Sequence, residues 1–388
     1  MAFSDFGGAL LTAGVEVPYR REAPVGSTGD LLAQAFGAAL AQSGFAPSDI
    51  DGLGVASFTL APDHAIDLAW RLGLTLRWCA DDCHGGASAI NLLQHAMRAI
   101  QCGDANVIAL VSGDRFEPAD FKRLVEHYNV TTRTYLRPLE IGGPNALFAM
   151  LTERHAKRYG LTRRDYGALC VAQREWAALN PQAVYRKPLS IDDYLSAPIV
   201  ADPLGRFDCV PVVSGANAVI VARADFVRRE RNVGIRALQC RYNADHQMGD
   251  GLQTTLASIA PTLWREAKAA PDDIDMVSVY DDYPVMALVQ LADLGFAPER
   301  DMRALIARIA ARELAVNTSG GQLSAGQAGA AGGMHGLVEA ITQLRGEAGE
   351  RQVADARLAL VTGYGMVEYR HGMCANAVVL EAHRRGSS

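Results

Sequence analysis

Short runs of apolar, largely β-branched residues recur along the chain and predict buried strands. They span residues 52–57, 106–112, 216–222, 233–238, 276–280, 358–362 and 375–380. Between these runs, apolar positions at helical spacing predict helices over residues 30–43, 87–101, 252–269 and 333–345, the third kinked or split at Pro261. Strands that alternate with helices predict the α/β class.

The chain then repeats itself in a fixed order. Ala-Pro-Ser-Asp-Ile-Asp at residues 46–51 recurs as Ala-Pro-Asp-Asp-Ile-Asp at residues 270–275, each time between a predicted helix and a predicted strand. Two further pairs of similar segments keep this order, at 109–113 and 359–363 and at 216–219 and 375–378. A Pro and Asp turn before a strand explains either copy alone, but not the shared order. We therefore expect two halves of similar topology, 1–230 and 231–388.

The spacing of the repeated segments locates an insertion. Gly113 and Ala216 are 103 positions apart, whereas Gly363 and Ala375 are 12 apart. The first half therefore carries about 90 extra residues, at 114–204. We expect this segment to lie on the core of the two halves as a lid or substrate domain.

Composition is that of an ordinary globular protein. Apolar residues make up 49% and charged residues 21% of the 388 residues, and the sequence predicts neither a membrane span nor a signal peptide. The net charge of -6 gives no electrostatic reason to expect a nucleic-acid partner. Seven cysteines without framework spacing suit free thiols in a reducing cytoplasm, which is the expected localisation.

Four groups of residues carry a resemblance to a known family. They are Gly86-Ala87-Ser88-Ala89 opening a predicted helix that ends at Gly103, Asn180-Pro181-Gln182-Ala183 with Pro203-Leu204, Val279-Tyr280-Asp281, and Asn317-Thr318-Ser319-Gly320-Gly321 followed by Gly326 and Gly333. Jointly, they make the chain resemble the thiolase superfamily, near the sterol carrier protein thiolases, over nearly its whole length. The resemblance implies the thiolase fold, in which two pseudo-repeated βαβαβαββ halves form a five-layer αβαβα core, here with an inserted lid segment.

The four catalytic positions of thiolases are all replaced. A thiolase carries its nucleophilic cysteine at the start of a buried helix, where free backbone N–H groups stabilise a thiolate. Here that position, counted back from Gly103, is Gly86. Tyr280 stands at the asparagine, Gln327 at the histidine and Tyr364 at the second cysteine. Together these losses argue against covalent acyl transfer by the cysteine and histidine route.

The segment Gly363-Tyr364-Gly365 resembles the thiolase-like aldolases that shorten steroid side chains. The resemblance implies that Tyr364 and a second tyrosine, which the alignment places at Tyr280, act in retro-aldol cleavage of a β-hydroxyacyl-CoA. This reaction needs a base near the β-hydroxyl and a group that stabilises the enolate. Since a phenol has a pKa of about 10, a tyrosine base needs its pKa lowered. We expect Tyr364 to take the hydroxyl proton, directly or through water, and Tyr280 to orient the substrate or donate to the developing charge. Packing between the halves is the alternative role for Tyr364.

The neighbours of these tyrosines are candidates for the substrate pocket. His84 is either a polar pocket residue or a hydrogen-bonded loop histidine, and Asn317 either orients the thioester or holds the turn after it. His335, at a helical position, is expected to be structural. The pocket candidates are His84, Gly86, Asn317, Gln327, Gly363 and Gly365.

Other motifs are given structural interpretations. Cys83 lies three residues before the expected helix start and is interpreted as a buried or half-buried thiol without a catalytic role. Cys79, Cys83 and His84 superficially resemble a zinc site, but no second ligand pair follows, so no metal is expected. The glycines between 320 and 333 lack a phosphate-loop lysine and predict tight core turns with an edge that faces CoA.

We therefore expect an enzyme, an aldolase of the thiolase superfamily, that cleaves a β-hydroxyacyl-CoA thioester in the degradation of a steroid or related side chain. The products are a ketone or aldehyde and acetyl- or propionyl-CoA. Two other functions stay open, a noncatalytic acyl-CoA-binding scaffold subunit and an acyltransferase with a displaced nucleophile. No cofactor is expected beyond the CoA of the substrate. The resemblance implies a homodimer and a small partner protein with a zinc ribbon and an oligonucleotide/oligosaccharide-binding (OB) barrel.

Overall fold

A computed structural model describes residues 6–22, 24–139, 141, 143–243, 249–368 and 371–384 of the chain. The first half follows the order strand, helix, strand, helix, strand, helix, strand, strand. Its elements are β1 (Ala9–Arg20), α1 (Thr28–Ser43), β2 (Gly52–Ala56), α2 (Ala65–Arg71), β3 (Trp78–Asp81), α3 (Ser88–Cys102), β4 (Val107–Asp114) and β7 (Ser214–Arg223).

The second half repeats this order. Its elements are β8 (Arg231–Tyr242), α8 (Leu256–Ala267), β9 (Met276–Ser278), α9 (Pro284–Asp293), β10 (Ala315–Val316), α12 (Gly332–Leu344), β11 (Leu358–Glu368) and β12 (His371–Arg384). Two additional helices, α10 (Met302–Ala310) and α11 (Gly321–Ala325), flank β10. The predicted pair of βαβαβαββ halves is confirmed.

The strands of the two halves join in one sheet with a mirrored order. The order is β3-β2-β4-β7-β1 in the first half, which continues as β8-β12-β11-β9-β10 in the second. The two halves meet where Leu11 of β1 lies opposite Val233 of β8. In each half the inner strands run antiparallel and the outer ones parallel, so the carboxyl ends of β4 and β11 occupy equivalent positions.

The repeated Pro and Asp segment has the same task in both halves. Residues 47–49 and 271–273 each form a 3-10 turn after a helix. The final aspartate of each copy, Asp51 or Asp275, accepts backbone hydrogen bonds at the start of the neighbouring strand: Asp51 from Val107 at 2.8 Å, and Asp275 from Leu358 at 2.9 Å. In each half the segment therefore leads into one strand and, through its final aspartate, holds the start of the neighbouring strand. This shared task explains why the segment recurs.

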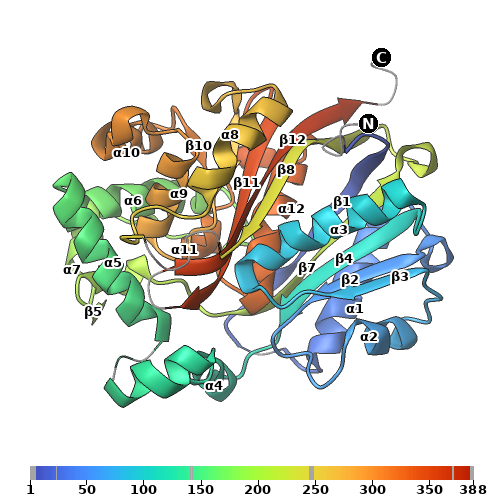
Figure 1. Cartoon of the computed structure of the whole chain (residues 1–388), viewed down its shortest axis with the longest axis horizontal. Coiled ribbons are helices and arrows are strands. Elements are labelled where there is room, and N and C mark those ends of the chain that lie inside the picture. Colours follow the sequence, from blue (N-terminus) through green and yellow to red (C-terminus); the bar gives the residue numbers. More distant parts are fainter. Residues whose placement is uncertain are drawn as a thin grey trace.

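Helices separate the sheet into layers. Helices α1 and α2 pack on the outer face of the first half, and α8 and α9 pack on the outer face of the second. Helices α3 and α12 lie between the two half-sheets and contact both. Figure 1 shows α8 and α9 on one side of the strands and α1 and α2 on the other. This arrangement confirms the five-layer αβαβα core.

The connection from β4 to β7 holds a long inserted segment. It contains α4 (Pro118–Glu126), α5 (Gly143–Tyr159), α6 (Arg163–Ala178), α7 (Ile191–Ser196) and the short strands β5 (Ile199–Ala201) and β6 (Leu204–Gly205). Although it belongs to the first half by sequence, its apolar residues join the core cluster of the second half, as Phe148 and Leu169 do. Figure 1 shows α5, α6 and α7 beside α9 and α11, on the far side of the molecule from α1 and α2.

Some elements differ from the prediction. Helix α8 begins at Leu256 and contains Pro261 in its interior, so the helix is not split there. Strand β1 was missed because it contains Gly14 and Pro18, and its register against β7 shifts around Pro18. No helix in the described ranges has the length and apolar character that would let it cross a membrane.

Candidate active site

The turn before α3 is the centre of the site. Gly86 lies in a 3-10 turn over residues 85–87 and is buried. A β-carbon at Gly86 would overlap the ring of Tyr280 and the backbone carbonyl oxygen of Tyr364. Glycine is therefore required by close packing, and the space of the expected nucleophile side chain holds a phenol ring.

The glycines of β11 face the same turn. A β-carbon at Gly365 would overlap the carbonyl oxygen of His84, and one at Gly363 would lie 2.9 Å from the carbonyl oxygen of Gly86. Because side chains alternate along a strand, the ring of Tyr364 projects from the opposite face of β11. That ring is 2% exposed and belongs to an apolar cluster that also contains Tyr280 and residues of the inserted segment.

Tyr280 lies two residues after the end of β9, and its backbone N–H and carbonyl are both hydrogen-bonded. Its N–H donates to Thr362 Oγ1 at 3.0 Å, and its carbonyl accepts from Gln290 Nε2 at 2.7 Å. Its phenol oxygen accepts a hydrogen bond from Gln327 Nε2 at 2.9 Å. Burial raises the pKa of Tyr280 well above its usual value, with the charge of Asp282 adding to the effect. The phenol is therefore neutral, and its proton is available for donation.

Gln327, which is expected at the position of the thiolase histidine, connects the two halves. Its backbone N–H donates to the carbonyl of Pro211 at 3.0 Å, and its carbonyl accepts from Val213 at 3.2 Å. Besides Tyr280, its side-chain amide donates to Gln322 Oε1 at 3.1 Å. These contacts orient one Gln327 N–H toward the phenol oxygen.

Two consecutive aspartates after Tyr280 have different surroundings. Asp281 accepts from the backbone of Gln322 at 2.8 Å and from Gln173 Nε2 at 3.0 Å, so it anchors α11 and α6. Asp282 as a residue is half-buried, but its Oδ1 is shielded from solvent and has no hydrogen-bond partner among the described residues. Burial, together with the neighbouring charge of Asp281, raises the pKa of Asp282 to about 8. The sequence analysis assigned no role to Asp282, although two adjacent carboxyl groups after a buried strand were a visible signal.

The inserted segment places aromatic residues against β11 and the loop before α9. The phenol of Tyr128 reaches Met366 Sδ at 3.9 Å, and burial raises the pKa of Tyr128 to about 12. Tyr283 donates its phenol proton to Asn145 Oδ1 at 2.6 Å and stacks on Phe148 at 4.3 Å between ring centroids. The sequence analysis missed Tyr128, because nothing local distinguishes it from other tyrosines of the insertion.

His84 and Asn317 have clear local hydrogen bonds. The Nδ1 of His84 lies 3.0 Å from Asp82 Oδ1, and its ring packs against Tyr242 at 5.4 Å between centroids. Asn317, with φ of 52°, accepts from the backbone of Val279 at 2.8 Å and accepts again, through its carbonyl, from Gly320. These contacts are those of a loop histidine and a turn residue, and a role of either in substrate binding stays a prediction.

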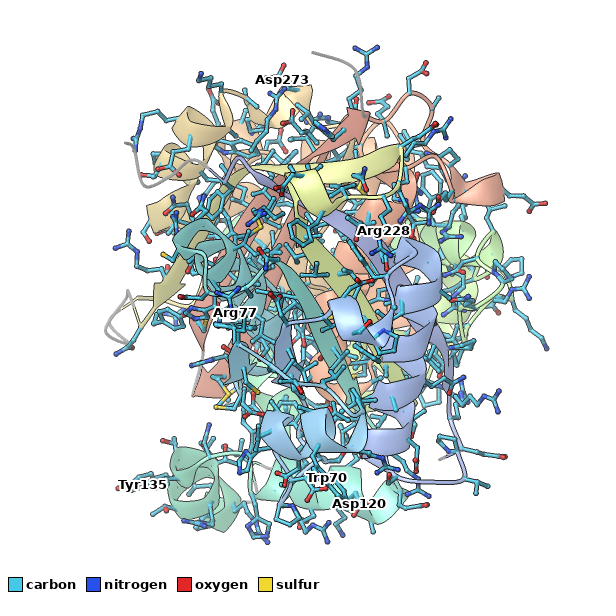
Figure 2. All side chains as sticks on the ribbon, turned by 90° about the vertical axis from the view of Figure 1, so that its right-hand side faces the viewer. Trp70, Arg77, Asp120, Tyr135, Arg228 and Asp273 are labelled. Carbon is cyan, nitrogen blue, oxygen red and sulfur yellow. The ribbon has the colours of Figure 1, made fainter. Side chains whose placement is uncertain are left out.

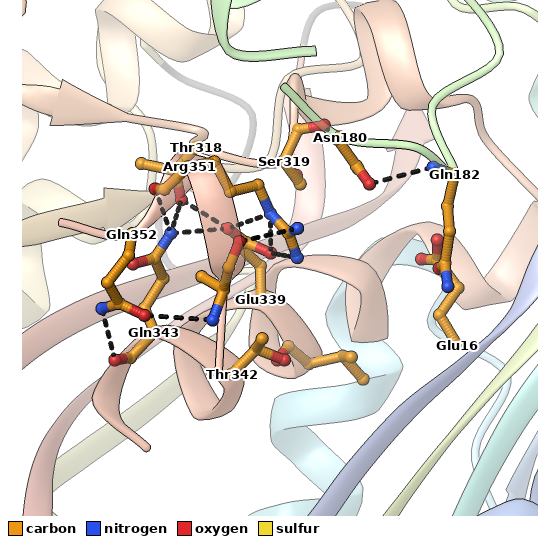
Figure 3. Close-up of polar contacts among 12 residues, drawn as sticks. Glu16, Asn180, Gln182, Thr318, Ser319, Glu339, Thr342, Gln343, Arg351 and Gln352 are labelled. Carbon is orange, nitrogen blue, oxygen red and sulfur yellow. Dashed lines mark hydrogen bonds and ion pairs between the residues drawn. The ribbon is translucent and has the colours of Figure 1, made fainter. Parts of the chain in front are cut away.

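The segment after Asn317 is fixed by a buried polar network. Thr318 donates to Glu339 Oε1 at 2.6 Å, and Arg351 pairs with Glu339 at 2.9 Å (Figure 3). Asn180 of the inserted segment donates to the carbonyl of Ser319 at 2.9 Å. Hydrogen bonds therefore connect the segment after Asn317 both to α12 and to the inserted segment.

His335 links β1 to this motif. Its Nε2 lies 2.7 Å from Ser319 Oγ, and its Nδ1 lies 2.6 Å from Glu16 Oε2. Burial by itself would lower the pKa of His335, but the charge of Glu16 outweighs it and the pKa is raised. The residue is buried in this ion pair, as a structural histidine would be.

The two cysteines before α3 lie on the surface of the molecule. Cys83, which was expected to be buried or half-buried, is an exposed free cysteine, and so is Cys79. Within the described part of the chain, no group of three or more His, Cys, Asp or Glu side chains is arranged to hold a metal ion.

Comparisons with known proteins agree with this arrangement. Residues 237–378 match the family described as thiolase C-terminal domain-like. The chain is 33% identical over 355 residues to the 17-hydroxy-3-oxo-4-pregnene-20-carboxyl-CoA lyase of Mycobacterium tuberculosis, covering 86% of this chain and 90% of that protein. It is 28% identical over 354 residues to the steroid side-chain-cleaving aldolase of Thermomonospora curvata, covering 86% and 89%. The solved structure of an Ltp2-ChsH2(DUF35) aldolase superposes with a TM-score of 0.85 at 26% identity, over 98% of this chain and 99% of that one. The chain therefore belongs to the thiolase superfamily, in its group of aldolases, and is a carbon–carbon lyase.

Proposed function

We propose that the chain cleaves a β-hydroxyacyl-CoA thioester whose acyl group is the side chain of a steroid or related ring system. The products would be a ring ketone or an aldehyde and a short acyl-CoA. The observation that carries this proposal is the Tyr280 ring in the space of the nucleophile, with its phenol held by Gln327. A thioester bound at Gly86 would meet a hydrogen-bond donor and no thiolate.

The two tyrosines divide the chemistry in this proposal. A neutral Tyr280 donates a hydrogen bond to the thioester oxygen as the enolate forms, and Gln327 orients its phenol. Tyr364 takes part in moving the β-hydroxyl proton. Gly86, Gly363 and Gly365 let the turn before α3, the Tyr280 ring and β11 pack closely together, and His84 and Asn317 are proposed to lie at the pocket margin.

The inserted segment is proposed to supply contacts to the acyl group. A cavity of about 280 Å³ lies between α5, α6 and α7 and the start of α9. Leu161, Tyr166 and Leu204 line it together with Val285, three residues beyond Asp282. An apolar cavity next to the reactive loop suits a hydrophobic ring better than a charged group.

A homodimer and a second protein complete the proposal. Strand β3 ends the sheet, and α2 beside it exposes Ile66 by 63% and Trp70 by 86%. Figure 2 shows Trp70 on this side of the molecule. An unpaired edge with large exposed apolar side chains supports pairing of two copies there. The aldolase of known structure is named with a DUF35 partner, and we expect a small zinc-ribbon and OB-barrel partner here, in the cytoplasm.

The test is product analysis. The purified chain, alone and with its partner, is incubated with a steroid β-hydroxyacyl-CoA and followed by time-resolved mass spectrometry. A ketone or aldehyde with a shortened acyl-CoA supports the proposal. An acylated cysteine would indicate an acyltransferase, and no turnover even with the partner would indicate a scaffold; either result overturns it.

A further inference from the structure

Three buried polar groups near Tyr280 have no hydrogen-bond partner in the described part of the chain. They are the hydroxyl of Ser278 and the side-chain NH2 groups of Asn317 and Gln322. The three residues are only 2–3% exposed. Because a buried polar group without a partner lowers the stability of the folded protein, nearly all such groups in native structures are paired, with protein or with ordered water.

The orientation of both amides is fixed by bonds on their oxygen sides. Asn317 Oδ1 accepts from the backbone N–H of Val279 at 2.8 Å, and Gln322 Oε1 accepts from Gln327 Nε2 at 3.1 Å. Turning either amide over would set its NH2 group against another donor. In addition, a β-carbon at Gly332 would overlap Gln322 Oε1, so the start of α12 confines this side chain. Both NH2 groups are therefore held toward the side that lacks a partner.

The three unpaired groups belong to residues that line one small cavity. It lies between the end of β9, the segment 317–322 and the start of α12, and Asp281 lines it as well. Two of the side chains meet beside Gly321, since a β-carbon there would overlap the Asp281 carboxylate and lie 2.8 Å from Asn317 Nδ2. The space open to the centre of a water molecule is about 10 Å³, which is room for a single water.

We propose that this cavity is a binding site for one water molecule held by Ser278, Asn317 and Gln322. The water oxygen accepts from both amides, and its two protons go to the Ser278 hydroxyl oxygen and the Asp281 carboxylate. A cation in this place would face two N–H donors, and an anion would lie beside the Asp281 carboxylate. Water satisfies both kinds of group, and three or four polar partners are usual for a buried water.

The water completes a chain of contacts that ends at the Tyr280 phenol. It holds the NH2 group of Gln322, whose Oε1 accepts from Gln327 Nε2, and the same Nε2 donates to the phenol oxygen at 2.9 Å. This role rests on the proposed function, in which a neutral Tyr280 donates to the enolate. Because the water touches neither the phenol oxygen nor the substrate, Ser278, Asn317 and Gln322 are positioning residues.

A high-resolution crystal structure of the chain tests the site directly. One ordered water should lie within hydrogen-bond distance of Ser278 Oγ, Asn317 Nδ2 and Gln322 Nε2. Density for an ion, no density at all, or side chains that bond one another across the cavity would overturn the water site.

A double-mutant cycle tests the bridge in solution. Ser278→Ala and Gln322→Met each remove one partner of the water, and each should lower the thermal midpoint and reduce kcat by about threefold to tenfold with KM nearly unchanged. No hydrogen bond joins these two side chains among the described residues, so the shared water should make their losses non-additive. Ser43→Ala, at a buried serine at the end of α1, is the matched control, and its loss should add to that of Gln322→Met.

The outcomes separate the water site from the proposed function. Additive losses of Ser278→Ala and Gln322→Met in the thermal midpoint would overturn the bridge. A folded Ser278→Ala with wild-type kcat would overturn the positioning role while leaving the lyase intact. If the wild type cleaves no β-hydroxyacyl-CoA, the proposed function fails and the positioning role fails with it, whereas the crystal structure and the thermal cycle still decide whether the water is bound.

Discussion

The ring of Tyr280 lies where a side chain at residue 86 would have to lie, so a side chain at residue 86 and this ring cannot be present together. A β-carbon at Gly86 would overlap Cε2 and Cζ of this ring, and it would also overlap the backbone carbonyl oxygen of Tyr364. A thiolase nucleophile and this tyrosine are therefore alternatives within one space. In this chain the space holds a phenol ring.

Gly86→Ala should damage both stability and turnover. The added methyl group meets a ring and a backbone oxygen, and overpacking of this kind costs about 1–3 kcal/mol of unfolding free energy. Chemical denaturation and turnover measure the two effects. Gly37→Ala, at an exposed position of α1 with open space around it, is the control and should be neutral or stabilising. A Gly86→Ala protein with wild-type stability and rate would contradict the packing argument.

Tyr280→Phe should lower kcat by about 10²–10³, because it removes the donor that stabilises the enolate. Folding should change little, since the side-chain amide of Gln327 keeps its bond to Gln322. Tyr135→Phe, at a tyrosine that is 59% exposed and labelled in Figure 2, controls for loss of a phenol. Equal rates for the two variants would remove Tyr280 from the mechanism.

Tyr364→Phe tests the residue that matches the aldolase motif. If the phenol carries the β-hydroxyl proton, turnover should fall by about 10²–10⁴ with CoA binding retained. If the ring only packs within its buried cluster, removing the hydroxyl should leave the rate near that of wild type. Steady-state kinetics and the thermal midpoint of the variant distinguish these outcomes.

Cys83→Ser should stay within a few fold of wild-type activity, because this exposed thiol lies outside the turn at Gly86. Iodoacetamide should modify Cys83 without loss of turnover. A loss of about a thousandfold, with protection by substrate, would instead indicate covalent catalysis.

Stability should depend on pH through Asp282. Its folded-state pKa, about 8, exceeds the unfolded value of about 3.9, so the folded protein binds the extra proton. Its contribution is fully present below pH 4 and is lost as pH rises through about 8. Asp114 and Asp281 also titrate high, each with a pKa of about 6, so the comparison must be with Asp282→Asn. Between pH 6 and 9 the wild-type thermal midpoint should fall more steeply than that of the variant, and parallel curves would argue against the raised pKa.

The core of the fold was readable from the sequence because its strands are continuous apolar runs and its two halves repeat. The end of the strand predicted at 276–280 could not be predicted in this way. The ladder ends at Ser278, so Tyr280 emerges into the loop before α9 and can turn toward Gly86. Apolar pattern marks burial, but it does not mark where backbone pairing ends.

The sequence by itself determined the thiolase-like halves, the insertion and the absence of a thiolase nucleophile, because these depend on order, spacing and residue type along the chain. Only the tertiary structure decided where the replacements lie. It set the ring of Tyr280 against Gly86, turned Tyr364 to the other face of β11, and left one carboxylate oxygen of Asp282 enclosed without a donor among the described residues. The raised pKa values of Tyr280 and Asp282 arise from burial and neighbouring charges, which the fold and not the local sequence brings about.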